Sequence, residues 1–177
     1  MTSQRLNIAT ARIDRSKPLS FTYEGKRFSG YEGDTLASAL LAAGTRMTGR
    51  SFKYGRPRGI IGFGPEEPNA LVQVESGART IPNLKATQVE LYDGLIARRT
   101  TGWPSLNFDA KSIGGKFARF MPAGFYYKTF KAPAFLWPRF EHIIRNAAGY
   151  GSAPADPDPE QYDHRHHHAQ VLVVGGG

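Results

Sequence analysis

The last seven residues of the chain, 171–177, constrain its fold more strongly than any other stretch. They read Val-Leu-Val-Val-Gly-Gly-Gly, so four consecutive apolar β-formers run into glycines. This pattern is typical of the first strand of a parallel sheet entering a nucleotide-binding turn. The sequence therefore predicts that residues 170–177 begin a Rossmann-type dinucleotide-binding domain that is truncated in this chain.

The candidate cofactor-binding residues are Gly175, Gly176 and Gly177, because a residue without a Cβ lets the backbone approach phosphate oxygens. A complete fingerprint also needs a third glycine three residues further on and a helix whose N-terminus faces the pyrophosphate. Neither is present in the sequence. We expect an incomplete turn with the remainder of the domain beyond Gly177, and no tight dinucleotide binding by this chain alone.

The preceding residues predict an α+β unit that starts with a β-hairpin. Residues 20–24 alternate apolar and polar side chains, and the sequence Glu24-Gly25-Lys26 supplies a turn into residues 27–31. Further strands are expected at 71–74, 87–91 and 95–97. Residues 1–17 are polar without periodicity, which predicts a mobile N-terminal arm.

A helix is expected directly after the hairpin. Asp34 is the predicted N-cap, Gly44 the predicted end, and four apolar residues share one face: Leu36, Ala39, Leu40 and Ala43. A hairpin, one helix packed across it and later strands in the same sheet together predict a β-grasp domain over residues 18–100.

Residues 47–64 form a glycine-rich basic loop within this domain. Its candidate phosphate or interface contacts are Arg50, Lys53, Arg56 and Arg58, interleaved with Phe52 and Tyr54. Such a loop can pair with acids across a domain interface, bind a cofactor phosphate or follow a nucleic-acid backbone. The interface is the favoured interpretation, and nucleic acid is the least favoured.

The composition changes after residue 100. Residues 117–140 hold nine aromatic side chains, broken by three prolines, and residues 98–145 carry nine Lys or Arg against two acids. Prolines exclude one long helix, although residues 139–146 fit a short helix ending near Gly149. So many aromatics need a partner surface to cover them, so residues 101–151 are predicted to be an aromatic, basic docking segment. Residues 152–169 then read as a proline-stiffened linker.

The four histidines of this linker, at 164, 166, 167 and 168, are predicted to be linker residues, not metal ligands, because adjacent side chains diverge. The absence of cysteine from all 177 residues removes disulfides and thiolate ligands and fits a cytoplasmic protein. No stretch has the roughly 20 apolar residues of a membrane span. A net charge of +8 suits an acidic partner subunit or cofactor phosphates as well as nucleic acid. No catalytic set is evident.

The chain resembles the α subunits of heterotetrameric sarcosine oxidases and of related flavin-dependent opine and hydroxyproline dehydrogenases. The resemblance is carried, in order, by residues 33–40 (Gly-Asp-Thr-Leu-Ala-Ser-Ala-Leu), 50–59 (Arg-Ser-Phe-Lys-Tyr-Gly-Arg-Pro-Arg-Gly), 68–74 (Pro-Asn-Ala-Leu-Val-Gln-Val), 103–105 (Trp-Pro-Ser), 123–130 (Ala-Gly-Phe-Tyr-Tyr-Lys-Thr-Phe) and the terminal Val-Val-Gly-Gly-Gly. It implies that the chain is the N-terminal portion of such a subunit.

The resemblance also implies a ferredoxin-like β-grasp domain, which in some relatives holds a two-iron two-sulfur cluster on four cysteines. The matching loop, about residues 62–70, and the later position near 83–87 contain no cysteine. We therefore expect no iron-sulfur cluster. This loss fits the sarcosine oxidase branch better than the dehydrogenases that keep a cluster.

The function implied by the resemblance belongs to a full complex with β and smaller subunits. Such a complex oxidatively demethylates sarcosine to glycine with O2 and tetrahydrofolate, using FAD and FMN, while its α subunit holds NAD. Gly175 and Gly177 match the first two glycines of the NAD fingerprint. The 177-residue chain itself is expected to be inactive. The alternatives are an α subunit of an opine or hydroxyproline dehydrogenase and, in another class, a basic nucleic-acid-binding module.

Overall fold

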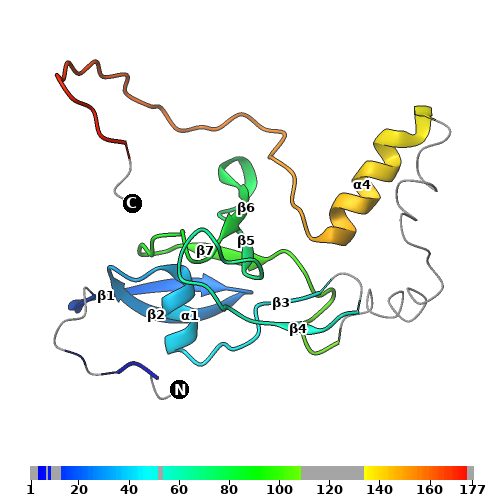
Figure 1. Ribbon diagram of the computed structural model, residues 1–177, viewed down its shortest axis with the longest axis horizontal. Coiled ribbons are helices and arrows are strands. Elements are labelled where there is room, and N and C mark those ends of the chain that lie inside the picture. The colour runs from blue at the N-terminus through cyan, green and yellow to red at the C-terminus, as the bar shows by residue number, and fades with distance from the viewer. Residues whose placement is uncertain (1–3, 7, 9–12, 52–53, 109–133, 175–177) are drawn as a thin grey trace.

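The computed structural model describes residues 4–6, 8, 13–51, 54–108 and 134–174. A five-stranded mixed sheet is crossed by one helix, α1 (Leu36–Ala42), as Figure 1 shows. The strands are β1 (Asp14–Tyr23), β2 (Lys26–Glu32), β5 (Leu71–Val74), β6 (Ile81–Lys85) and β7 (Ile96–Arg99), in the spatial order β2-β1-β7-β5-β6. Strands β1 and β7 are parallel, and the other neighbours are antiparallel. This arrangement agrees with the predicted α+β fold.

The predicted hairpin is formed by β1 and β2. Its turn residues Glu24 and Gly25 have φ angles of 53° and 72°, as the two positions of a type I′ turn require. Phe21 and Tyr23 alternate onto the buried face. Strand β1 starts at Asp14 and pairs there with Glu32, so the arm predicted for residues 1–17 was wrong in its boundary. The register shifts between Asp14 and Pro18, and Lys17 within this stretch forms an exposed ion pair of 2.9 Å with Glu32.

Helix α1 begins differently from the prediction. Thr35 is the N-cap and forms a capping box with Ser38, whose amide donates to Thr35 Oγ1 at 3.2 Å. The predicted cap, Asp34, is buried and accepts hydrogen bonds from the Tyr31 amide at 2.9 Å and the Ser38 hydroxyl at 2.6 Å. It also pairs with Arg5 of the arm. The predicted helical face is confirmed for Leu36, Ala39 and Leu40, which are all fully buried, whereas Ala43 is half-buried at the C-cap.

One predicted strand does not form, and one strand of the sheet was not predicted. Residues 87–91 form a turn and one isolated bridge between Thr35 and Glu90, because the Leu36 amide donates to Val89 O and so ties this segment to the start of α1. The strand β6 went unpredicted, because it contains Pro82 and Asn83, two poor strand formers. It is an edge strand, where the missing N–H of a proline is tolerated.

The remaining regular structure lies beside or beyond the sheet. Strands β3 (Gly49–Arg50) and β4 (Pro57–Arg58) form a small hairpin, and η1 (Gly77–Arg79) is a 3-10 turn before β6. After residue 133, η3 (Ala134–Leu136) leads into α4 (Trp137–Ala148), which stands apart from the sheet in Figure 1. The predicted short helix is confirmed, with Gly149 closing it at φ 84°.

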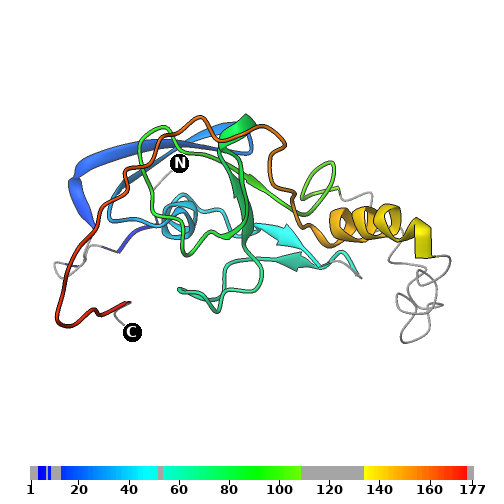
Figure 2. The same ribbon diagram turned by 90° about the horizontal axis from the view of Figure 1, so that it is seen from above.

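Residues 150–174 run as an extended segment without helix or strand, visible from above in Figure 2. The strand predicted at residues 171–174 is therefore not formed, and its four side chains are 79–88% exposed. A strand needs a hydrogen-bonding neighbour, and no described strand lies against this segment. Within the described parts of the chain, no helix is long and apolar enough to cross a membrane.

A buried carboxylate in the loop between β4 and β5

The feature of the sheet domain with the most unusual chemistry is the side chain of Glu67. It lies in the loop that connects β4 to β5 and is 0% exposed. One carboxylate oxygen, Oε2, accepts hydrogen bonds from the amides of Ile61, at 2.7 Å, and Gly62. The other, Oε1, accepts from the Asn69 amide at 2.7 Å. The loop is thus folded around a negative charge.

The protonation of Glu67 follows from this environment. Burial by itself raises the pKa of the carboxyl, but hydrogen bonds from the amides of Gly62, Asn69, Ile61 and Ala70 outweigh it and hold the pKa below its ordinary value. The side chain is therefore ionised at neutral pH. Three backbone N–H groups donate hydrogen bonds to this one buried charge, which makes the loop an anion-binding concavity occupied by the chain itself.

The neighbouring residue Glu66 makes a second, exposed set of the same contacts. Its Oε1 accepts hydrogen bonds from the amides of Phe63 at 2.8 Å and Gly64 at 3.0 Å. Its own amide and those two lower the pKa of this carboxyl as well. A Cβ on Gly62 would lie 2.8 Å from Glu66 Oε1 and 3.1 Å from Glu67 Cα, so a glycine at this position leaves room for the Glu66 carboxylate and the Glu67 backbone.

The end of β6 and the residues that follow it hold the loop through hydrogen bonds to its backbone carbonyls. The Thr87 hydroxyl donates to Gly64 O at 2.7 Å, and the Lys85 ammonium donates to Pro65 O. The Ala86 amide donates to Ala70 O at 2.9 Å. The two cysteine-free positions that the resemblance pairs, about 62–70 and 83–87, are therefore side by side in the structure.

The basic loop predicted as a contact site forms the β3–β4 hairpin, and Lys53 lies outside the described residues. Arg50 turns inward: its Nη1 donates to Gly55 O at 2.5 Å, and its Nε donates to Leu106 O. The Arg56 guanidinium lies 5.0 Å from the centre of the Tyr54 ring. Arg58 is exposed on β4. Among the described residues, no ion pair joins Arg50, Arg56 or Arg58 to an acid.

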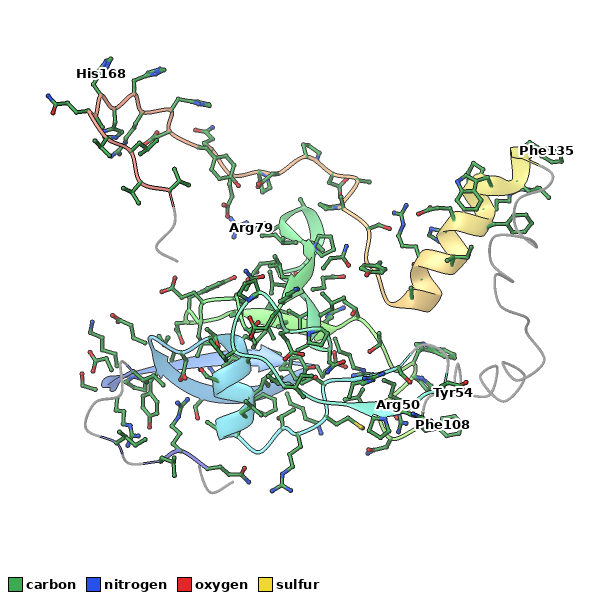
Figure 3. All side chains as sticks on the ribbon, viewed as in Figure 1. Arg50, Tyr54, Arg79, Phe108, Phe135 and His168 are labelled. Atoms are coloured by element: carbon green, nitrogen blue, oxygen red, sulfur yellow. The ribbon has the colours of Figure 1, made fainter. Side chains whose placement is uncertain are left out.

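The basic loop and the linker histidines lie in different parts of the described structure. Figure 3 shows Arg50 and Tyr54 near Phe108 at the β3–β4 end of the molecule, whereas His168 lies far away on the extended segment. Gly175, Gly176 and Gly177 lie outside the described residues. The aromatics of residues 117–130 do so too. Over the part of the chain that is described, no group of three or more His, Cys, Asp or Glu side chains could hold a metal ion.

Sequence reasoning missed Glu67 altogether. The local sequence, Gly-Phe-Gly-Pro-Glu-Glu-Pro at 62–68, indicates a turn but does not distinguish the exposed Glu66 from the buried Glu67. The available signal was the presence of two glutamates in the loop that the resemblance associates with a cluster, because converging backbone amides bind anions.

Comparisons with known proteins add the family context. Residues 16–102 match the model of the 2Fe-2S iron-sulfur cluster binding domain. The sarcosine oxidase α subunit of Rhizobium meliloti (strain 1021) is 54% identical over 93% of this chain, which covers 17% of that protein. The sarcosine oxidase α subunit of Corynebacterium sp. (strain U-96) is 34% identical over 98% of this chain, which covers 14% of that protein. The chain thus spans about a sixth of the length of these curated relatives.

One solved structure, that of L-proline dehydrogenase from P. horikoshii, is 29% identical to this chain. The match covers 52% of this chain and 17% of that protein, with a TM-score of 0.40, which is too low to bear on the fold.

The matched domain type raises the question of whether this loop could hold a cluster. A two-iron two-sulfur cluster is ligated by four cysteine thiolates, two of which histidines replace in some variants. This chain has no cysteine, and its loop offers glycines, prolines and two glutamates whose oxygens already accept backbone hydrogen bonds. The residues present do not fit the cluster.

Proposed function

This chain belongs to the family of sarcosine oxidase α subunits, and we propose that it forms the N-terminal, cluster-free β-grasp portion of such a subunit. The observation that carries the proposal is the 54% identity over 166 residues with the Rhizobium meliloti protein, which extends through both the sheet domain and the segments after it. The chain contributes a domain to an oxidoreductase complex; it supplies no catalytic residue of its own.

The reaction that we propose for the full complex is the oxidative demethylation of sarcosine. In this scheme the N-methyl group is oxidised to an imine at a flavin on the β subunit, electrons pass to a second flavin and O2, and the one-carbon unit passes to tetrahydrofolate. FAD and FMN belong to the complex, and NAD to the α subunit. Gly175 and Gly177 would be the first two glycines of the NAD turn. We place the complex in the cytoplasm.

The role proposed for residues 101–151 is docking onto other parts of the complex. Support comes from large apolar side chains that lie exposed at this end of the molecule, among them Trp103 at 63%, Phe108 at 64% and Phe135 at 79%. Exposed aromatic side chains of this size are often covered in an assembly. The excess of Lys and Arg over residues 98–145 suits an acidic partner surface.

The experiment that tests the proposal is co-expression of the full-length α subunit with its partner subunits, followed by assays of amine oxidation. Sarcosine turnover with O2 consumption, and product transfer to added tetrahydrofolate, is the expected result. Turnover of opines or hydroxyproline in place of sarcosine would move the chain to the dehydrogenase branch. A parallel measurement with the 177-residue chain alone should show no sarcosine turnover, no micromolar NAD binding and no salt-dependent binding of DNA or RNA.

A further inference from the structure

The structure offers a reason why this domain keeps its fold without a metal cluster. We propose that the Glu67 carboxylate takes the place of the cluster, as the built-in anion around which residues 61–70 fold. The proposal concerns this domain alone and does not depend on the reaction of the full complex.

The first step is the convergence of donors on one carboxylate. The amides of Ile61, Gly62, Asn69 and Ala70 all act on Glu67, although they come from both sides of the loop. Successive amides that point to a common centre form the kind of concavity that binds phosphates and iron-sulfur clusters. With the side chain 0% exposed, solvent cannot take over the role of this anion.

The second step is the position of the carboxylate in the matched domain. The cluster-binding domain model covers residues 16–102. Glu67 lies within the first of the two segments that the resemblance expects to ligate a cluster, about 62–70, and the second, about 83–87, is hydrogen-bonded to it. Every thiolate is missing, yet the loop is closed by hydrogen bonds from Thr87 and Lys85. The amide concavity therefore persists while the group that it surrounds has changed from a metal cluster to a side chain.

The consequence is a loop whose order depends on a charged carboxylate and not on iron or redox state. The decisive variant is Glu67→Gln in the full-length protein, because it keeps the shape but turns one acceptor oxygen into an NH2 group that faces amide donors. We expect hydrogen exchange of residues 61–70 to accelerate about tenfold or more, with the β1–β2 hairpin unchanged.

The matched control is Glu66→Gln, whose amide contacts are exposed. Water replaces them, so exchange of the same residues should stay within about twofold of the wild type. Exchange of residues 61–70 in Glu67→Gln that equals the wild-type rate would overturn the proposal.

A cavity variant separates charge from shape. In Glu67→Ala the loop should recover protection in millimolar propionate but not in propionamide, which has the same outline without the charge. Failure of propionate to exceed propionamide would contradict the proposed role of the anion.

If neither variant folds, the wild-type protein still provides a test through its pH dependence. The other titratable groups facing the loop are Glu66 and Lys85. Because the pKa of Glu67 is depressed in the folded loop, its stabilisation is present above the ordinary glutamate pKa and is lost as pH falls through the depressed pKa. Protection of residues 61–70 should fall there before that of β5 and β7, in the wild type and in Glu66→Gln alike. A loop that exchanges in step with β5 and β7 throughout this range would refute the proposal.

Discussion

Residues 14–100 and residues 134–174 differ in where their apolar side chains lie. Every buried apolar side chain of the described structure belongs to the first region, from Phe21 to Ala97. In the second region, Phe135 is 79% exposed and the side chains of residues 171–174 are 79–88% exposed. Apolar β-forming residues are thus buried in the first region and exposed at positions 171–174 of the second. The difference teaches that β-forming residues make a core only where strands and a helix meet around them.

The charged groups of the two regions differ in the same sense. In the sheet domain, Asp34 and Glu67 are buried and each accepts several hydrogen bonds. On the extended segment the ion pairs are exposed, as between Arg79 and Glu160 at 3.3 Å, near the Arg79 label in Figure 3. Buried charges with several partners define one conformation, whereas exposed pairs are weak. We infer that the first region is organised by its own contacts and the second by a surface that it docks on.

The largest expected difference in stability comes from replacing one leucine with alanine in each region. Leu40→Ala removes a fully buried leucine from α1 and should lower the free energy of unfolding by about 3 kcal/mol, through lost burial and a cavity. Leu172→Ala, at a side chain 79% exposed, should change it by less than about 0.5 kcal/mol. Urea unfolding followed by circular dichroism measures both. Equal losses would show that residues 171–174 are part of the folded core.

A smaller effect is expected at the contact between the arm and the helix. Arg5 pairs with Asp34, whose side chain is 0% exposed, and the Arg5 side chain itself is 13% exposed. Arg5→Ala removes hydrogen bonds to a buried carboxylate that keeps the Tyr31 amide and Ser38 hydroxyl as partners, so the loss should be about 2 kcal/mol.

The control for this pair is Lys17→Ala, since Lys17 and Glu32 form an ion pair in which both side chains are 55% exposed. Solvent screens that pair, and its loss should be much smaller than that of Arg5→Ala. Arg5→Ala with no greater loss than Lys17→Ala would mean that the arm is not anchored on Asp34.

The parts of the fold that the sequence predicted are those in which local pattern and tertiary contacts agree. The alternation of residues 20–24 and the face of Leu36, Ala39 and Leu40 each matched a surface that could bury them. Where they disagreed, tertiary contacts decided: residues 87–91 look like a strand but bond to the start of α1, and β6 forms despite Pro82. Asp34 was predicted as a cap because it directly precedes the helical pattern. Its pairing with Arg5 joins residues that are 29 positions apart, and a local pattern cannot reveal such a contact.

The candidate site was less predictable than the fold. The resemblance marked residues 62–70 only as a loop without cysteine, which excluded a four-thiolate cluster, and it identified no site there. The replacement anion could not be found, because Glu66 and Glu67 are adjacent glutamates whose burial depends on how residues 61–70 fold back on themselves. The inward turn of Arg50 toward Gly55 O and Leu106 O was equally hidden, since it depends on contacts made only in the folded hairpin.

The smallest effect at neutral pH is expected for two tyrosines that share a pKa shift but not its cause. Burial raises the pKa of Tyr23 to about 12, with Arg99 opposing it, whereas a hydrogen bond to Asp158 raises the pKa of the exposed Tyr162 to about 12. The buried hydroxyl of Tyr23 has no hydrogen-bond partner among the described residues. Tyr23→Phe should therefore change stability at pH 7 by less than about 1 kcal/mol.

The two tyrosines are expected to differ in how they affect stability above pH 10. Unfolded Tyr23 ionises near its ordinary pKa of 10.0 but the folded residue keeps its proton, so wild-type stability should fall as pH rises from 10 toward 12, by about 2 kcal/mol. Tyr23→Phe should lose this part of the pH dependence. Tyr162→Phe should keep the wild-type profile, because a side chain 68% exposed is screened by solvent in both states. Urea unfolding at pH 8 and pH 11 distinguishes the three proteins. A flatter profile in Tyr162→Phe than in Tyr23→Phe would mean that the extended segment, and not the sheet core, controls stability in alkali.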